Sequence, residues 1–189
     1  MSPSRLIPTA SQTVGPFFEV ALAPDARLGC LVTGPATRGE RIRLSLRVLD
    51  GDGAPVPDAL VEIYQANTNG EYPASSSPGA EFHGFGRLAT DTDGVCVFDT
   101  IRPGRVSDGR GGLQAAHINV CLFARGLLRH LYTRVYFAGD PALAGDPLLA
   151  LVPADRRPTL LASPSEDRPG TWAFDIHLQA DAETVFFEL

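Results

Sequence analysis

The feature that most constrains this chain is a strict two-residue alternation in residues 41–50, RIRLSLRVLD. Successive side chains of a β-strand point to opposite faces, so this spacing separates the apolar residues from the arginines and the serine. A strand of this kind belongs in a sheet that buries one face and exposes the other, which is typical of antiparallel sheets. The inward residues are then Ile42, Leu44, Leu46 and Val48.

Short apolar runs bounded by Gly, Pro or Asp recur along the rest of the chain and predict further strands. The Asp93-Gly94 pair is a typical hairpin turn and is expected to join two of these strands directly. A short helix is expected at 145–152, with Asp146 as its N-cap and Pro153 as its stop. The predicted strands are residues 41–50, 59–65, 86–90, 95–101, 116–124, 131–138, 171–178 and 184–189.

These elements predict an all-β fold, an antiparallel β-sandwich with little helix and an extended N-terminal arm. Residues 1–40 contain prolines and glycines without a sustained period, which indicates an extended arm. We assign residues 1–40 to this arm, as part of the same unit, and residues 41–189 to the sandwich. A length of 189 residues fits a single domain.

The charge balance and the cysteines limit the partners and the location. A formal net charge of -6 provides no attraction to phosphate backbones or anionic lipids, so we expect no nucleic-acid partner. No apolar run approaches the roughly 18 residues that span a bilayer, and the start lacks a continuous apolar signal segment, so we expect neither membrane association nor export. Cys30, Cys96 and Cys121 are odd in number and widely spaced, which predicts free thiols and a cytoplasmic location.

The stretch QAAHINV places His117 and Asn119 on one face of a strand, among apolar residues. A buried polar group without a partner costs about 1–3 kcal/mol, so both side chains need partners. Two explanations remain open from these residues alone: a core histidine bonded to a backbone carbonyl, or a functional site. The other histidines, His83, His130 and His177, form no recognisable metal-binding pattern with His117.

Three longer segments resemble the intradiol ring-cleavage dioxygenases. They are DALVEIYQANTNGEY at 58–72, FHGFGRLATDTDGVCVFDTIRPG at 82–104 and AHINVCLFARGLLRHLYTRVYFAGDP at 116–141. Together with the short length, SQTVGPFF at 11–18 resembles in particular the α chains of two-chain members that cleave protocatechuate. The resemblance implies a β-sandwich and, in catalytic members, a non-haem ferric ion held by two tyrosines and two histidines.

Two of the four implied ligand positions keep their residue type, Tyr72 and His117. Val106 stands at or beside the second tyrosine, and Asn119 replaces the second histidine. Ferric iron is held by anionic oxygen and imidazole donors, so we interpret the four positions as the relic of a metal site and expect no metal in this chain. The alternative is a weakened active centre in which Asn119 ligates through its oxygen and Asp108 substitutes for the lost tyrosine.

The resemblance implies a non-catalytic α subunit, with no catalytic residue in this chain. A homologous β subunit would bind Fe(III), and the complex would cleave protocatechuate with O2 to 3-carboxy-cis,cis-muconate. The resemblance further implies that Thr13, Gly15 and Pro16 in the arm approach the bound substrate together with Arg134. The guanidinium of Arg134 would pair with the substrate carboxylate.

Other interpretations remain open. Arg134 can be a solvated cross-strand charge, the segment around Thr13 a cover for a sheet edge, and Tyr72 a turn aromatic. For the whole protein, the alternatives are a self-sufficient intradiol dioxygenase for catechol-type substrates, and a non-enzymatic sandwich that binds an aromatic acid or a protein partner. Iron content and dependence on a partner separate these alternatives.

Overall fold

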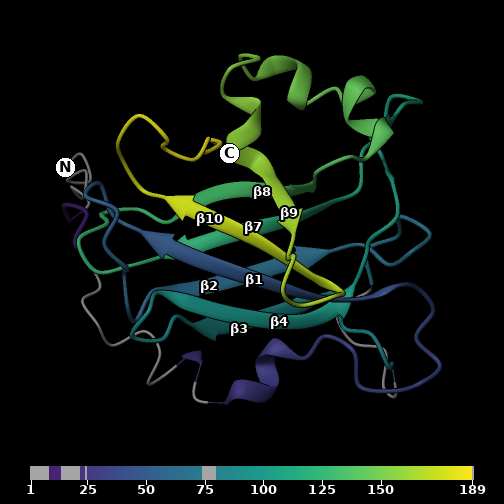
Figure 1. Ribbon diagram of the computed structural model, residues 1–189, viewed down its shortest axis with the longest axis horizontal. Helices are drawn as coiled ribbons and strands as arrows, with labels where there is room; N and C mark the ends of the chain where they lie inside the picture. Colours follow the sequence, from purple (N-terminus) through teal and green to yellow (C-terminus); the bar gives the residue numbers. More distant parts are fainter. Residues whose placement is uncertain (1–8, 14–21, 24, 74–79, 189) are drawn as a thin grey trace, which may run out of the picture.

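The computed structural model describes residues 9–13, 22–23, 25–73 and 80–188. Its strands form two stacked layers, which Figure 1 shows face on. One layer contains β4, β1 and β10, and the other contains β3, β2, β7 and β8. The strands are β1 Arg41–Leu49, β2 Leu60–Gln65, β3 Phe85–Ala89, β4 Val95–Ile101, β5 Val106–Ser107, β6 Leu113–Gln114, β7 His117–Phe123, β8 Leu131–Phe137, β9 Leu161–Pro164 and β10 Thr171–His177.

The core lies between the two layers. Burial alternates along β1 as predicted, with Ile42, Leu44, Leu46 and Val48 buried. Burying an aliphatic side chain of this size contributes about 1.5–3 kcal/mol, so this alternation is enough to orient the strand. The all-β sandwich is confirmed. The cluster that contains these four residues also holds the inward residues Val61, Ile63, Ile118, Val120, Leu122, Val135 and Phe137.

Strand β9 links the two layers along one edge. It pairs in parallel with β8, where Leu161 is opposite Tyr136, and antiparallel with β10. Strand β1 also pairs in parallel with β10. The eight strands therefore follow one continuous order, β3-β2-β7-β8-β9-β10-β1-β4. The predicted antiparallel pairing holds for the other pairs of this order, so the sandwich is mixed only at the β8–β9 and β10–β1 pairs.

The predicted hairpin at Asp93-Gly94 is wrong in its pairing, although the turn itself forms. Oδ1 of Asp91 accepts hydrogen bonds from the N–H groups of Asp93 and Val95, and Gly94 has a φ of 72°. Beyond this turn β3 pairs with β2, whereas β4 pairs with β1. The chain therefore passes from one layer to the other, because the layer that a strand joins depends on partners distant in the sequence.

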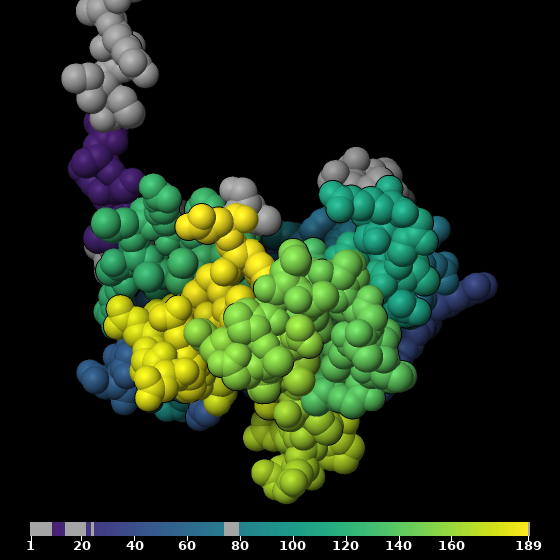
Figure 2. Space-filling view, turned by 90° about the horizontal axis from the view of Figure 1, so that it is seen from above, coloured from purple at the N-terminus to yellow at the C-terminus, as the bar shows by residue number. Residues whose placement is uncertain are grey.

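Residues 145–152 do not form the predicted single helix. Two short 3-10 helices flank Asp146 instead, η3 (Pro141–Gly145) and η4 (Leu149–Leu151). Asp146 ends η3 and Leu148 takes the N-cap position of η4, but Oδ1 of Asp146 still accepts from the N–H groups of Leu148 and Leu149 at 2.9 Å each. Together with η5 (Arg157–Leu160) these helices form the green segment above the sheets in Figure 1. Figure 2 shows this segment from above, beside the teal segment that contains β5 and β6.

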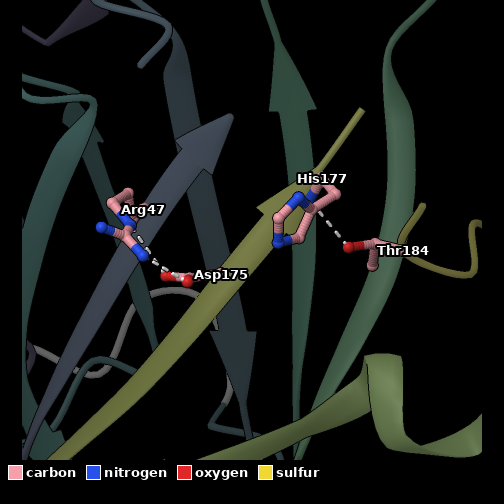
Figure 3. A network of polar contacts seen from close by, with 4 residues as sticks. All are labelled: Arg47, Asp175, His177 and Thr184. Atoms are coloured by element: carbon pink, nitrogen blue, oxygen red, sulfur yellow. Dashed lines mark hydrogen bonds and ion pairs between the residues drawn. The ribbon is translucent and has the colours of Figure 1, made fainter. Parts of the chain in front are cut away.

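The strand predicted at 184–189 is also wrong, since the described part of it forms only an isolated bridge between Tyr132 and Phe187. Thr184 instead folds back onto the end of β10. Its Oγ1 accepts from the N–H of His177 at 3.0 Å (Figure 3). The carbonyl of His177 in turn accepts from the N–H of Thr184 at 2.9 Å. These reciprocal bonds turn the chain away from a regular ladder.

Part of the predicted arm is attached to the sandwich. Leu31 is fully buried, and its N–H donates to the carbonyl of Asp99 in β4 at 2.9 Å. Just before it, the 3-10 helix η2 (Ala26–Gly29) is capped by the side chain of Asp25. None of the helices in the described ranges is long and apolar enough to cross a membrane. The division into arm and sandwich stays a prediction.

Candidate functional site

The outer face of the β3-β2-β7-β8 layer carries a row of side chains that crosses four strands. Phe85, Tyr64, Asn119 and Arg134 are directly opposite one another in successive strand pairs. Opposed residues of neighbouring strands share a face, so these four side chains lie side by side, away from the core. Tyr64 and Phe85 are 41% and 43% exposed, so this end of the row is open to solvent.

An open pocket of about 460 Å³ lies over this row. Cys121 and Tyr132, the next opposed pair on the same face, contribute to it, and Leu148 and Phe187 approach from outside the sheet. Apolar and aromatic walls with a few polar groups are typical of a small-molecule site. The pocket is lined by Glu62, Ile63, Tyr64, Phe85, Asn119, Val120, Cys121, Tyr132, Thr133, Arg134, Leu148, Phe187 and Glu188.

Tyr72 reaches the same face from the loop that follows β2. Asn67 shapes this loop, because its Oδ1 accepts two backbone N–H groups from within it. Gly70 has a φ of 80°, and a Cβ there would lie 1.8 Å from the carbonyl oxygen of Arg105. Only glycine therefore lets the loop pack against the segment that leads into β5. The ring of Tyr72 then stacks on Tyr64 with 4.8 Å between ring centroids.

Hydrogen bonds connect Tyr72, His117 and Asn119 in one defined direction. Nδ2 of Asn119 donates to the carbonyl of Tyr64 at 3.1 Å, and this bond fixes the amide orientation because a carbonyl only accepts. The same nitrogen donates to the hydroxyl oxygen of Tyr72 at 2.9 Å. The Tyr72 hydroxyl then donates to Nε2 of His117 at 3.3 Å. Nδ1 of His117 donates to the carbonyl of Ala115 at 2.8 Å, which places a ring proton on Nδ1 and, in a neutral imidazole, leaves Nε2 free to accept.

The surroundings of His117 agree with this neutral form. Its side chain is fully buried, and burial, followed by the positive charge of Arg134, lowers its pKa to about 4. The backbone bond to Ala115 and the charge of Asp146 act in the opposite direction and are weaker. His117 is thus a buried histidine whose two ring nitrogens both have partners, one of them the backbone carbonyl considered above.

The four positions implied for iron do not fit a ferric ion in this chain. Tyr72 and His117 carry donor atoms of a suitable kind, but these atoms are hydrogen-bonded to each other. Asn119 presents its NH2 group to this network, and an N–H donor cannot ligate a cation. Val106 is buried and has no donor atom in its side chain. Only two donors of the required kind remain, and they bind each other.

Asp108, the residue considered as a substitute ligand, is engaged in the β5–β6 turn. Its Oδ1 accepts from the N–H groups of Arg110 and Gly112 at 2.8 Å each. These backbone bonds hold the pKa of the Asp108 carboxyl below its usual value. Across the described ranges, no group of three or more His, Cys, Asp or Glu residues could hold a metal ion.

Arg134 lies half-buried on β8, opposite Asn119. Its Nη1 donates to Oε1 of Gln114 at 2.6 Å. Five acids of the described ranges form ion pairs with arginines, and none of these arginines is Arg134. The positive charge of Arg134 therefore faces the pocket without an acidic partner.

Thr13 lies away from the residues that line the pocket. Its Oγ1 accepts from the N–H of Gly126, in the turn between β7 and β8, at 2.8 Å. Gly15 and Pro16 fall outside the described residues. The structure therefore brings Asn119 and Arg134 to the pocket, with Tyr72 and His117 beside it, and the substrate role of the arm stays a prediction.

The sequence reasoning missed Tyr64 and Gln114. Tyr64 is the outward residue of a strand that was predicted, so its alternation with Ile63 and Gln65 was a usable signal. Gln114 directly precedes the strand that carries His117, but its partner Arg134 is twenty residues away in the chain. No local pattern connects these two side chains.

Comparisons with known proteins identify the family of this chain. The family described as Dioxygenase matches residues 14–180, and the chain belongs to this dioxygenase family. The resemblance noted in the sequence motifs is thereby confirmed. The chain is 40% identical over 195 residues to the protocatechuate 3,4-dioxygenase α chain of Burkholderia cepacia, covering 96% of this chain and 97% of that relative.

The chain is also similar to a β chain and to a solved dioxygenase domain. A protocatechuate 3,4-dioxygenase β chain of Burkholderia cepacia is 39% identical over 138 residues, which cover 68% of this chain and 58% of the relative. Among solved structures, the dioxygenase domain of a fusion with a carbohydrate-binding protein from Streptomyces sp. SirexAA-E superposes with a TM-score of 0.63 and 29% identity. That match covers 95% of this chain and 100% of the other. The similarity to the α chain covers more of this chain and more of the relative than the similarity to the β chain does.

Proposed function

We propose that this chain is the non-catalytic α subunit of a hetero-oligomeric protocatechuate 3,4-dioxygenase. A homologous β subunit binds Fe(III), and the complex inserts both atoms of O2 into protocatechuate to give 3-carboxy-cis,cis-muconate. The observation that carries the proposal is the closed network of Tyr72, His117 and Asn119, in a chain similar over its whole length to an α chain. A network of this kind supports a subunit that binds no metal.

In this proposal the chain contributes recognition to the shared substrate pocket. Protocatechuate carries a carboxylate, and Arg134 offers a guanidinium that no acid of the described ranges neutralises. Charge-assisted, forked pairing between these groups favours the acid over plain catechol. A substrate role for Thr13, Gly15 and Pro16 rests only on their resemblance to the family motif, and for Thr13, which here bonds Gly126 away from the pocket residues, it would need a pocket that the β subunit extends to the arm.

Iron content tests the division of roles. The chain is produced alone and together with its β partner, and iron, visible colour and protocatechuate-dependent O2 uptake are measured in both samples. We expect iron and uptake only in the joint sample. An iron-containing, active single chain would show a self-sufficient dioxygenase, and the absence of uptake with any homologous β chain would favour a binding module.

Replacement of Arg134 tests the recognition role. In the assembled complex, Arg134→Ala is expected to raise KM for protocatechuate by roughly 10–100-fold, the effect of losing a charged hydrogen bond of about 1.5–3 kcal/mol. The kcat is expected to change less, because in this proposal Arg134 binds the carboxylate and not the ring carbons that react. An unchanged KM would remove this role from Arg134.

We also propose a cytoplasmic location. Cys30, Cys96 and Cys121 are free thiols. Burial raises the pKa of Cys121 to about 11 and that of Cys96 further, so both stay protonated near neutral pH. Free thiols in this state suit a reducing compartment. Fractionation of producing cells, with recovery of the chain outside the cytoplasmic fraction as the contrary outcome, tests this location.

A further inference from the structure

The guanidinium of Arg134 is held by a neutral partner, which is unusual on this face. Its Nη1 donates to Oε1 of Gln114 at 2.6 Å. On the same face Arg87, which is also half-buried, pairs with the carboxylate of Glu62 instead. Arg134 is therefore oriented like a paired arginine but keeps its charge available.

Gln114 is itself fixed from two sides. Its Nε2 donates to the carbonyl of Ser107 in the paired strand β5 at 3.4 Å. Because a carbonyl only accepts, this contact turns Oε1 of the amide towards Arg134. The N–H of the next residue, Ala115, donates to Oδ2 of the buried Asp146 at 2.7 Å. The β5–β6 hairpin thus presents one acceptor atom at a defined place beside the pocket.

We propose that Gln114 is a positioning residue that directs Arg134 at the carboxylate of the bound aromatic acid without neutralising its charge. This inference rests on the proposed function, in which Arg134 meets protocatechuate. A guanidinium has five N–H donors, so the bond to Gln114 and the interaction with the Tyr136 side chain still leave donors for a carboxylate. An arginine that is already oriented also loses less side-chain freedom when the substrate binds.

The lack of charge on Gln114 is as important as its place. A carboxylate at this position would form an ion pair with Arg134 and would compete with the substrate for the same donors. A methionine has a similar length but offers no comparable acceptor, so Arg134 would keep its charge and lose its orientation. Gln114→Glu and Gln114→Met therefore separate the effect of charge from the effect of positioning.

The test uses the complex assembled with its β subunit, under anaerobic conditions that prevent turnover. Dissociation constants are measured for protocatechuate and for catechol, which lacks the carboxylate, and their ratio reports carboxylate recognition. We expect Gln114→Glu to reduce the preference for protocatechuate by about tenfold or more, and Gln114→Met to reduce it by about threefold, with catechol binding unchanged. Gln179→Glu, at an exposed position after β10, is the matched control for the added charge.

Arg134→Met in the same assay separates this inference from the proposed function. If Arg134→Met removes the preference and both Gln114 variants keep it, Arg134 reads the carboxylate without Gln114, and the inference is wrong. If Arg134→Met itself keeps the preference, the proposed substrate contact is wrong and the role of Gln114 is lost with it. Equal weakening of both ligands in the Gln114 variants, with a lowered Tm, would indicate a purely structural role and would also overturn the inference.

Discussion

The two layers of the sandwich share one core but present different chemistry on their outer faces. On the layer that contains β1, directly opposed charges pair with each other. Arg43 lies 3.2 Å from Asp99, and Nε of Arg47 donates to Asp175 at 3.0 Å (Figure 3). On the layer that contains β2, the outer row exposes two aromatic rings and ends at Arg134, which has no acidic partner among the described residues.

This difference indicates that the outer face of the β1 layer is a solvated surface and that the outer face of the β2 layer has features of a binding surface. Exposed ion pairs stay hydrated and contribute little to stability, so the β1 layer is a solvated surface. Exposed aromatic rings are poorly solvated by water, and a half-buried charge without an acidic partner is only partly hydrated. Both are features of binding faces. If the two faces differ in energy as well as in composition, substitutions in the two layers should change stability by different amounts.

The largest effect on stability is expected at Asp146, which is hydrogen-bonded to one end of the layer that contains β7 and β8. Its carboxyl is buried and accepts from the N–H groups of Ala115 and Leu149 and from the hydroxyl of Tyr136. Asp146→Ala leaves these donors without partners, so the free energy of unfolding should fall by about 3–5 kcal/mol. Urea denaturation measures this loss, and the exposed Asp155→Ala, with a change within about 0.5 kcal/mol, is the control. A comparable result for both variants would contradict the prediction.

The second effect depends on pH and belongs to the same layer. The pKa of His117 is lowered to about 4 in the folded chain, against about 6.5 in an unfolded chain. Between these values the unfolded chain binds more protons, so the contribution of His117 to stability is complete above about pH 6.5 and is lost as the pH falls towards 4. The expected loss is about 3 kcal/mol in total.

Denaturation of the original chain and of His117→Gln across this pH range isolates that contribution, because the carboxyl groups titrate in both. The free energy of unfolding of the original chain should fall more steeply between about pH 6.5 and 4 than that of the variant. Parallel pH profiles would show that His117 does not titrate as its burial implies.

A smaller effect is expected for the hydroxyl of Tyr72. Tyr72→Phe removes the bonds to Asn119 and His117 but keeps the ring that stacks on Tyr64. Because the ring is partly exposed and water can replace one partner, the free energy of unfolding should fall by about 1 kcal/mol. Tyr64→Phe is the matched control in the same stack, since its hydroxyl makes no hydrogen bond in the described part of the chain. A larger loss of unfolding free energy in Tyr64→Phe than in Tyr72→Phe would contradict the hydrogen bonds assigned to the Tyr72 hydroxyl.

The smallest effect is expected on the charged face. A double-mutant cycle with Arg47→Met and Asp175→Asn measures the coupling between the two side chains. Because the side chains are 49% and 39% exposed, the coupling should be below about 1 kcal/mol and should shrink in high salt. A coupling of about 3 kcal/mol would mean that this face is not simply a solvated surface.

Much of the fold could be predicted because alternation is a local property. The inward set from Ile42 to Val48 and the shared face of His117 and Asn119 both follow from spacing along one strand. The layer exchange between β3 and β4 could not be predicted, since each strand is paired with a partner far away in the sequence.

The site shows the same limit. The contact of Gln114 with Arg134 depends on the β5–β6 hairpin, whose strands are two residues long and carry no periodic signal. Asp146 was predicted as a helix N-cap; its side chain does accept N–H groups at the start of η4, but Leu148 takes the N-cap position. The bond of Asp146 to the N–H of Ala115, however, crosses thirty-one residues of sequence and follows from no local pattern.

The closed network around Tyr72 also bears on how such a chain changes over generations. Asn119→His would regain an imidazole but would break two hydrogen bonds, at a cost of about 1 kcal/mol each, and Val106 would still offer no donor. A single substitution towards a metal site would therefore lower stability without completing a set of donors. A metal site at these positions would need changes at Asn119 and Val106 together, and neither change alone would be favoured by stability.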